Sequence, residues 1–467
     1  MTAQTSTSIV KEADLRRFEF YASRIRRLQL SSFTENTSSH IYMAIATAFQ
    51  GKALFPALKH VEIFSLNDIS NENFLFLHLT APSPLSKVEI SGVTKSNAIR
   101  LTSFINDTAC HHRSRSTNLH PLSALSLEGS FLPPIANQLS DFTRLAELTF
   151  SPTVAQTNML REILEMSSSL LSLLQFKLEL PRDESEELRI NLSRESKLYT
   201  FPALQNLEVV GPARHVCDVL HSIYGAYLSS ITFTISPPVY ETEHKVPKCI
   251  RRCTTMTPTL LHLRINLPEH WIHMDDNLFR PFQNYRLLRS LHICSLGLTQ
   301  PHLVDLFDKK FGEWPLLESV ILELANGYQS CERDQTAPIR LPAFSCPKLR
   351  RLESYLNLPD SLFGQNTRVN YGVSLQDLLD SSEKTNHILT ELKIAFFELD
   401  YPHSFPSVDP YVFMEAKEPI LLARAIDRLY PNLKRLDICG DSSYPFWKPW
   451  YRGIEMMVKN FREARGA

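Results

Sequence analysis

Glycine is scarce in this chain: the 467 residues include 13 glycines, and no two of them lie closer than eight positions apart. The motifs G-x-G-x-x-G, G-x-x-x-x-G-K-[ST] and G-x-S-x-G all require glycines two to five positions apart. A His-Glu pair is also lacking, so the zinc-protease motif H-E-x-x-H is absent. These absences exclude the signatures of several large enzyme classes. We therefore predict a non-catalytic protein and assign no catalytic residue.

The chain also lacks an excess of charge of either sign. It has 49 Lys and Arg residues against 50 Asp and Glu residues, which gives a net charge of −1. Such a balance provides no general basic field for nucleic acid or for an anionic membrane. Basic pairs such as Arg26-Arg27 and Lys434-Arg435 exist, but acidic residues are expected on the same face. We expect no nucleic-acid partner.

Long apolar runs and a cysteine framework are missing as well. No run approaches the roughly 18 apolar residues of a bilayer-spanning helix, and residues 1–10 lack the apolar core of a signal peptide. The eight cysteines are scattered without paired spacing, which is typical of reduced thiols inside a cell. These features predict an intracellular protein, cytoplasmic or nuclear, with no membrane partner.

Three short clusters contain residue types that bind metal ions. Residues 269–276 group two imidazoles with three carboxylates, Cys249 and Cys253 lie one helical turn apart, and Cys110 precedes two histidines. None supplies the second Cys or His pair of a structural zinc site, in which three or four ligands must converge. We expect a polar loop and ordinary free thiols, with no metal site and no cofactor.

What the chain has in abundance is an apolar triplet with the spacing L-x-x-L-x-L. Its last copy is Leu433, Leu436 and Ile438. Intervals between successive copies run from 23 to 44 residues, and self-similarity at this period is the signature of a solenoid. The first positions of the fourteen copies are Ile25, Leu58, Leu85, Leu122, Leu145, Leu173, Leu204, Leu228, Leu260, Leu288, Leu317, Leu349, Leu389 and Leu433.

Within each copy, apolar and polar residues alternate. The fourth position is always apolar, and the sixth is apolar except at Ser354. The fifth position, which lies between them, is polar except at Ile321. Because successive side chains of a strand point to opposite faces, the alternation predicts a short strand with one buried face and one wet face.

Helical patterns occupy several of the intervals between strands, for example residues 41–49, 158–166, 215–224 and 420–429. Proline lies one or two residues before the triplet in eight copies and directs the chain into an extended conformation. Strand, helix and return, repeated in one direction, produce parallel strands with right-handed crossovers.

The pattern therefore predicts an α/β fold, a leucine-rich-repeat solenoid of about 14 irregular repeats. Its parallel strands would line the concave face of a horseshoe, and helices and loops would form the convex face. A doubly wound α/β domain is the alternative, but its strands are covered on both faces and read as continuous apolar runs. The polar face of these strands favours the open solenoid.

The expected domain boundaries follow from the same pattern. Residues 1–13 are small and polar and predict a disordered N-terminus, residues 14–441 contain the solenoid, and residues 442–467 predict a C-terminal cap. Residues 107–120 are expected to form a polar insertion before the fourth strand.

A binding surface is expected where the third and fifth positions of successive copies line the concave face. The C-terminal half is richer in Arg and His than the centre, and Arg is enriched at residues that dominate interfaces. The convex helices or the segment 400–418 are the alternative surfaces. The candidate partner-binding residues are Arg264, His292, Arg351, Glu353, Lys393, Arg435 and Asp437.

The repeats resemble irregular leucine-rich repeats that lack a regular closing asparagine. The stretch from Asp14 to Leu28 (DLRRFEFYASRIRRL) resembles the segment after the F-box in F-box/leucine-rich-repeat proteins of mushroom-forming fungi. Phe55-Pro-Ala-Leu58, Phe201-Pro-Ala-Leu204 and Tyr430-Pro-Asn-Leu433 resemble the segments that lead into that family's strands. The resemblance implies substrate recruitment for ubiquitin ligases of the Skp–cullin–F-box type.

The 24 residues before Ile25 are too few for an F-box, which needs several tens, so we expect that an F-box either lies upstream of this chain or has been lost. A Skp-type adaptor would be a partner only if an F-box lay upstream of this chain. The first functional hypothesis is therefore a substrate-recognition subunit, or a remnant of one, with an unidentified protein partner. The alternative is a free-standing leucine-rich-repeat scaffold unconnected to ubiquitylation, and an enzyme is the third possibility.

Overall fold

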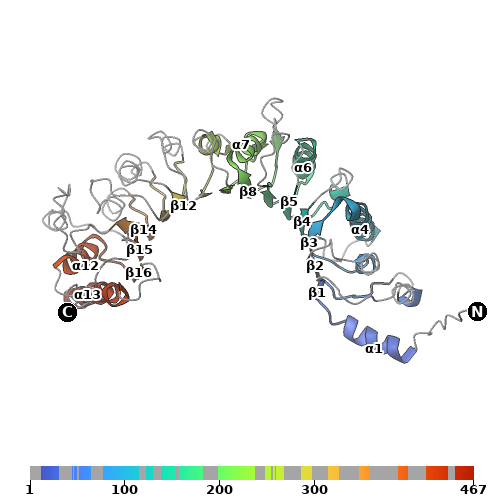
Figure 1. Ribbon diagram of the computed structural model, residues 1–467, viewed down its shortest axis with the longest axis horizontal. Coiled ribbons are helices and arrows are strands. Elements are labelled where there is room, and N and C mark those ends of the chain that lie inside the picture. The colour runs from blue at the N-terminus through green and yellow to red at the C-terminus, as the bar shows by residue number, and fades with distance from the viewer. Residues whose placement is uncertain are drawn as a thin grey trace, which may run out of the picture. The chain divides into compact units, whose positions relative to one another are not determined.

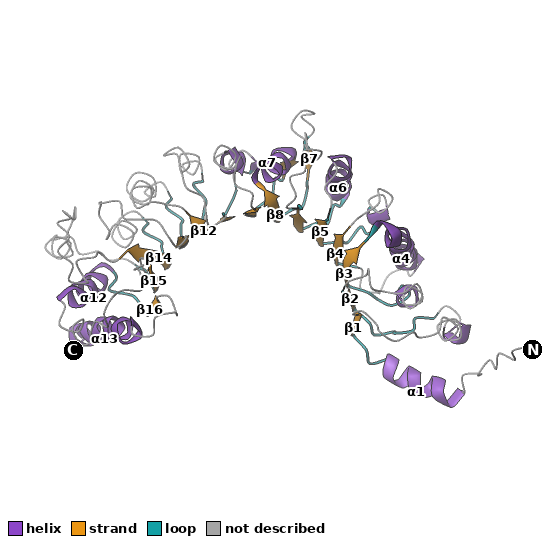
Figure 2. Cartoon of the chain, in the orientation of Figure 1, coloured by secondary structure: helices purple, strands orange, loops and turns teal. Residues whose placement is uncertain are grey.

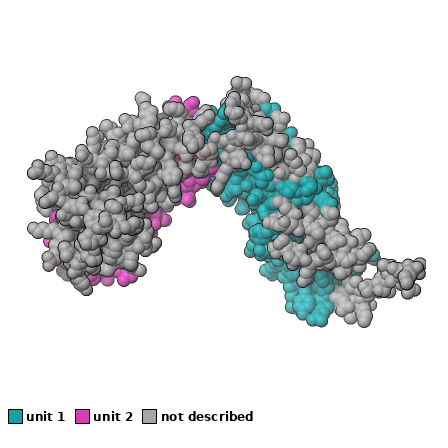
Figure 3. Space-filling model, in the orientation of Figure 1, with its two compact units in different colours: residues 1–227 teal, residues 228–467 magenta. Residues whose placement is uncertain are grey.

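The computed structural model shows an α/β protein whose main sheet has 14 parallel strands arranged in chain order (Figure 1, Figure 2). The chain divides into two compact units, residues 1–227 and 228–467 (Figure 3). Each unit contains seven strands of the main sheet. The structure describes residues 12–30, 45, 47–49, 52–64, 77–114, 122–129, 138–153, 157–181, 198–236, 248–253, 256–257, 259–267, 285–296, 314–324, 346–357, 388–397, 417–439 and 447–466.

In the first unit, the helices α4, α6 and α7 lie on one side of the strands (Figure 2). A separate parallel pair, β7 (Tyr199–Thr200) and β9 (Ile223–Tyr224), lies outside the main sheet. The helices are α1 (Glu12–Ala22), α4 (Lys95–Ser114), α6 (Thr157–Ser169) and α7 (Ala213–Ser222). The main-sheet strands are β1 (Arg27–Leu30), β2 (His60–Ile63), β3 (Lys87–Val93), β4 (Ala124–Gly129), β5 (Glu147–Pro152), β6 (Gln175–Glu179) and β8 (Asn206–Pro212).

In the second unit, α12 (Lys417–Leu429) and α13 (Trp447–Gly466) pack against each other, and α13 also packs against the last strand. The strands are β10 (Ser230–Ser236), β11 (His262–Asn266), β12 (Ser290–Leu296), β13 (Ser319–Leu324), β14 (Arg351–Asn357), β15 (Glu391–Phe397) and β16 (Arg435–Cys439).

The sequence periodicity correctly predicts all 14 main-sheet strands and their buried face. On β11, Leu263 and Ile265 are each 1% exposed. His262, which precedes Leu263, and Arg264, which lies between the two apolar residues, are exposed. Fourth-position side chains are buried in every copy except the first and the last, where Leu28 and Leu436 are half-buried. Both exceptions lie on outermost strands, β1 and β16, which have a neighbouring strand on one side.

A tight turn precedes most strands and explains the prolines. The backbone N–H of the first triplet leucine donates to the carbonyl three residues earlier, as from Leu58 to Phe55 at 3.1 Å and from Leu433 to Tyr430 at 3.2 Å. The accepting residues, Phe55 and Tyr430, have large buried side chains. Pro56 and Pro431 follow them at the second position of the turn. Proline is favoured there because its φ is already near the value that a type I or II turn requires.

The last strand is covered by the C-terminal helix. Glu455 of α13 accepts a hydrogen bond from the Ile438 backbone N–H at 2.9 Å, and Arg462 donates to the Leu433 carbonyl. Arg465 pairs with Asp427 of α12 at 2.5 Å. The contacts of Glu455 and Arg462 satisfy backbone groups on and just before β16, and the Arg465 pair joins the two helices.

One sequence expectation is wrong. Residues 107–114 do not begin a polar insertion but form the last two turns of α4. Thr108 and Ala109 are each 2% exposed and continue the buried helix face of Phe104 and Ile105, and the Thr108 hydroxyl donates to the Phe104 carbonyl at 2.8 Å. Of the polar residues that suggested a loop, Cys110 is exposed and His111 is half-buried.

The helical expectations for residues 158–166 and 420–429 are confirmed by α6 and α12. The expected helix 215–224 is confirmed as far as Ser222, where α7 ends and the chain enters β9. Of the expected helix 41–49, residues 45 and 47–49 are described and are helical. Among the helices described, none combines the length and the apolar character that crossing a membrane would require.

Candidate partner-binding face

The third and fifth positions of the repeats form two parallel rows on one face of each unit's strands, which we call the polar face. Strand register aligns these positions directly across the second unit. The fifth-position row is Thr232, Arg264, His292, Ile321, Glu353, Lys393 and Asp437. The third-position row is Ser230, His262, Ser290, Ser319, Arg351, Glu391 and Arg435. All seven sequence-predicted binding residues therefore lie on these two rows.

Three of them form an ion-pair cluster on β14 and β15. Arg351 donates to Glu353 on the same strand, and Lys393 lies 3.5 Å from the other Glu353 oxygen. The Glu353 side chain is 13% exposed, so burial raises the pKa of its carboxyl. The Arg351 hydrogen bond and the Lys393 charge outweigh burial and hold the Glu353 pKa below its ordinary value. Glu353 is thus a fixed anion between two cations.

The charge alternates as the rows continue to β16. Arg351, Glu391 and Arg435 are register partners in one row, and Glu353, Lys393 and Asp437 are register partners in the other. Opposite charges directly across neighbouring strands support the pairing of those strands. Arg435 is exposed and forms no ion pair with another described side chain.

Arg264 and His292 are register partners on β11 and β12, and both approach Cys294, which the sequence analysis did not select. The Cys294 thiol lies 2.9 Å from His292 Nε2 and 3.9 Å from an Arg264 guanidinium nitrogen. Arg264 also donates Nε to Asn266 at 3.1 Å. Cys294 follows His292 by two positions and therefore lies on the same face of the strand. Continuing the period-two pattern of the sequence one step beyond the fifth position would have identified it.

The polar face of the first unit has a different charge balance. It carries Arg27, Lys87 and Lys177 against Glu62, Glu89, Glu147 and Glu208, with His60 in addition. In the second unit, Arg264, Arg351, Lys393 and Arg435 stand against Glu353, Glu391 and Asp437, with His262 and His292 in addition. The second unit is therefore the more cationic of the two faces.

Ion pairs also organise the first unit's polar face. Arg27 pairs with Glu62 at 2.5 Å, and Lys177 bridges Glu179 at 2.7 Å and Glu208 at 3.0 Å. The pKa of Lys177 is raised, because its two carboxylate partners outweigh the burial that would lower it. Among the described side chains, Arg27, Lys87 and Lys177 are thus all ion-paired, whereas Arg264 and Arg435 of the second unit are not.

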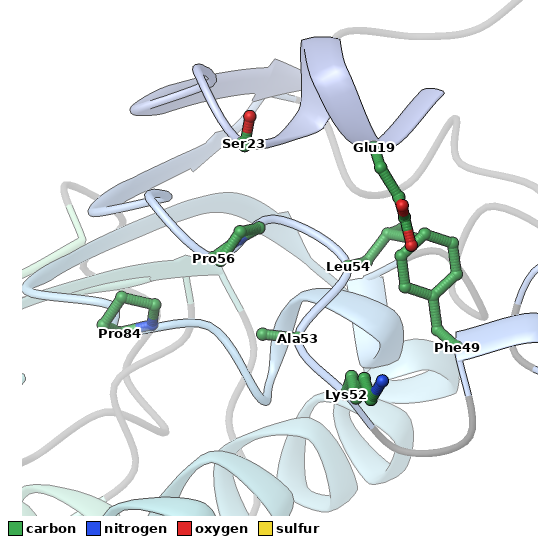
Figure 4. A pocket seen from close by; sticks show the side chains of 8 residues that line it. All are labelled: Glu19, Ser23, Phe49, Lys52, Ala53, Leu54, Pro56 and Pro84. Atoms are coloured by element: carbon green, nitrogen blue, oxygen red, sulfur yellow. The ribbon is translucent and has the colours of Figure 1, made fainter. Parts of the chain in front are cut away.

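A pocket of 480 Å³ lies away from the polar face, beneath α1 (Figure 4). Its lining includes Glu19 and Ser23 from the α1 segment and Phe49, Leu54 and Pro56 from the next repeat (Figure 4). Phe18 packs edge-on against Phe49 with ring centroids 5.8 Å apart, which fixes α1 on that repeat. Among the described lining side chains, no nucleophile is paired with a base.

Two of the three metal-type clusters noted in the sequence fall on described residues, and neither brings three possible ligands together there. Cys249 and Cys253 are both fully buried on a helical turn, and the Tyr285 hydroxyl donates to the neighbouring Ile250 carbonyl at 3.1 Å. Cys110 is an exposed residue of α4. The segment 269–276 lies outside the described residues. Among described residues, a different group brings three possible ligands together: His60, Glu62 and Glu89.

Comparison with known proteins adds no assignment to this geometry: no protein-family model and no curated protein matches the chain.

Proposed function

We propose that this chain is a non-catalytic protein-recognition module that binds a partner through the polar face of its second unit. In this proposal the protein is a leucine-rich-repeat horseshoe with the polar face on its concave side. It acts as a substrate-recognition subunit of the type found in F-box/leucine-rich-repeat ubiquitin-ligase receptors. The observation that carries the proposal is the alignment of all seven candidate residues on two rows across parallel strands.

The chemistry of the face favours a protein partner with acidic side chains. Arg264 and Arg435 are exposed, and neither forms an ion pair within the described part of the chain. Arginine presents a planar fork of donors that matches a carboxylate, and it is enriched among residues that dominate binding energy. Regular strands hold these side chains at fixed spacings, so a partner can contact several repeats with little loss of entropy.

The experiment begins with affinity capture of partners by the full chain. The same capture is then repeated with the triple variant Arg264→Glu, Arg351→Glu and Arg435→Glu. We expect the triple variant to lose the partner, because an acidic surface then meets like charge instead of opposite charge. Circular dichroism establishes that the variant is folded.

A matched control reverses the same amount of charge away from the polar face. Arg251, Arg286 and Lys348 are exposed and lie outside the two rows, so changing all three to Glu leaves the face intact. The control should retain the partner. Retention of every partner by the folded polar-face variant would refute the assignment.

The receptor and scaffold forms of the proposal differ in what happens to the captured partner. A substrate receptor shortens the partner's half-life, so removal of this chain from cells should lengthen it and reduce its ubiquitylation. A scaffold leaves both unchanged. Measuring the half-life of the captured partner with and without this chain therefore separates the two.

A further inference from the structure

Two carboxylates and one imidazole converge on the polar face of the first unit. His60 and Glu62 lie two positions apart on β2, and Glu89 on β3 is the register partner of Glu62. One ligand atom from each of the three lies within 4.8 Å of the other two. His60 Nε2 is 3.0 Å from a Glu89 carboxylate oxygen. We propose that His60, Glu62 and Glu89 form a binding site for a divalent first-row transition ion such as Zn²⁺.

The ligand types and their supports suit such an ion. Zinc takes imidazole nitrogen and carboxylate oxygen at about 2.0–2.2 Å, with three protein ligands and an open fourth position in many sites. Those bond lengths place tetrahedral ligands about 3.4 Å apart, so ligand atoms that now lie within 4.8 Å of one another must close by at most about 1.4 Å. Rotation of the two glutamate side chains provides that movement, while paired strands hold their Cα atoms.

Two cations now neutralise the carboxylates and would have to leave. Arg27 pairs with Glu62 at 2.5 Å, and Lys87 pairs with Glu89 at 2.7 Å. The Arg27 and Lys87 side chains are 59% and 44% exposed, whereas those of His60, Glu62 and Glu89 are 18%, 14% and 31% exposed. The ligands thus lie inside and the cations outside, where each can swing into water for the small cost of a surface ion pair.

The comparison with the second unit shows what distinguishes this cluster. Glu353 is likewise flanked by a same-strand arginine and a neighbouring lysine. However, among the described residues Glu353 belongs to no group of three possible metal ligands, because a histidine and a second carboxylate do not lie close to it. The first-unit cluster therefore has the donor set of a metal site in addition to that of an ion-pair network.

The test titrates the metal-stripped full chain with Zn²⁺ in competition with a chromophoric chelator. His60→Ala and Glu89→Gln each remove one ligand and should weaken binding at this site at least tenfold. His78→Ala is the matched control, because His78 contacts a single carboxylate, Asp107, at 2.8 Å and belongs to no three-ligand group among the described residues. It should bind Zn²⁺ as the parent chain does.

Lys87→Gln separates a metal site from a structural ion-pair cluster. Removing the competing cation frees Glu89, so the metal site predicts Zn²⁺ binding several-fold tighter than in the parent chain. Binding that is equal in the parent chain and in folded His60→Ala would overturn the proposal. So would binding that is unchanged or weakened in folded Lys87→Gln.

Discussion

At the scale of single residues, neighbouring positions on one strand have opposite roles. On β11, His262 and Arg264 face water while Leu263 between them is 1% exposed. The sequence predicts this division because period-two alternation has one physical reading in a half-buried strand. It does not predict which polar side chains meet, because ion pairs such as Glu353 with Lys393 depend on strand register across 40 residues of chain.

Leu263→Ala should lower the free energy of unfolding by about 2–5 kcal/mol, because it removes buried methyl groups and leaves a cavity. The adjacent control His262→Ala should change it by less than about 0.5 kcal/mol, since that side chain is exposed. Chemical denaturation of both variants measures the difference. Equal losses would contradict the assignment of buried and polar faces.

Glu353 gives a prediction with a defined pH window. Its folded-state pKa lies below the ordinary value of 4.5, so the folded protein binds fewer protons on this group than the unfolded chain does. The stabilisation is fully present above pH 4.5 and is lost as pH falls through the folded-state pKa. Glu353→Gln should therefore be less stable than the parent at pH 7, with the difference shrinking below pH 4.5.

Arg351→Gln is the matched variant for that measurement, because it removes the hydrogen bond that lowers the Glu353 pKa. Its stability difference from the parent should follow the same course with pH. A Glu353→Gln difference that grows on acidification would show that the pair does not stabilise the fold.

At the scale of elements, strands are more predictable from this sequence than the segments between them. Each strand repeats one triplet, so fourteen copies reinforce a single interpretation. The segments between strands have no common length or pattern, and each must be judged alone. The end of α4 shows the difficulty: Thr108 and Ala109 are weak apolar signals, yet both are buried against the rest of the unit.

Alanine substitutions at two glycines should change the stability of the fold in opposite directions. Gly129 on β4 has φ of +127°, and a Cβ there would lie 2.1 Å from the Val93 carbonyl oxygen of the neighbouring strand. Gly453 lies within α13, and a Cβ there would meet nothing within 4 Å. Gly129→Ala should therefore destabilise the fold by about 2 kcal/mol or more.

Gly453→Ala should stabilise the fold by about 0.5–1 kcal/mol, because alanine has the higher helix propensity. Thermal unfolding of the two single variants measures both effects. A destabilising Gly453→Ala would contradict the open space around that position, and a neutral Gly129→Ala would contradict the close strand approach.

At the scale of the whole molecule, a repeat array needs its ends covered. In α13, Ile454 and Val458 are at most 1% exposed, and Glu455 satisfies the Ile438 N–H of the last strand. Deleting residues 442–467 would expose this apolar surface together with the edge of β16. We expect the truncated chain to aggregate or to lose its cooperative unfolding transition. A soluble truncation that melts cooperatively, measured by calorimetry, would contradict the role of α13 as a cover.

The proposed contact between the polar face of the second unit and its partner can be tested by photo-crosslinking, with p-benzoylphenylalanine placed singly at Ser290 or Ser319 on the polar face. Probes at the exposed helix positions Ile420 and Met456, and at Ser404 in the segment 400–418, represent the alternative surfaces. We expect probes at Ser290 and Ser319 to crosslink to the captured partner and the other three probes to give no crosslink. Crosslinks from the helices or from Ser404, with none from the polar face, would contradict the proposed contact.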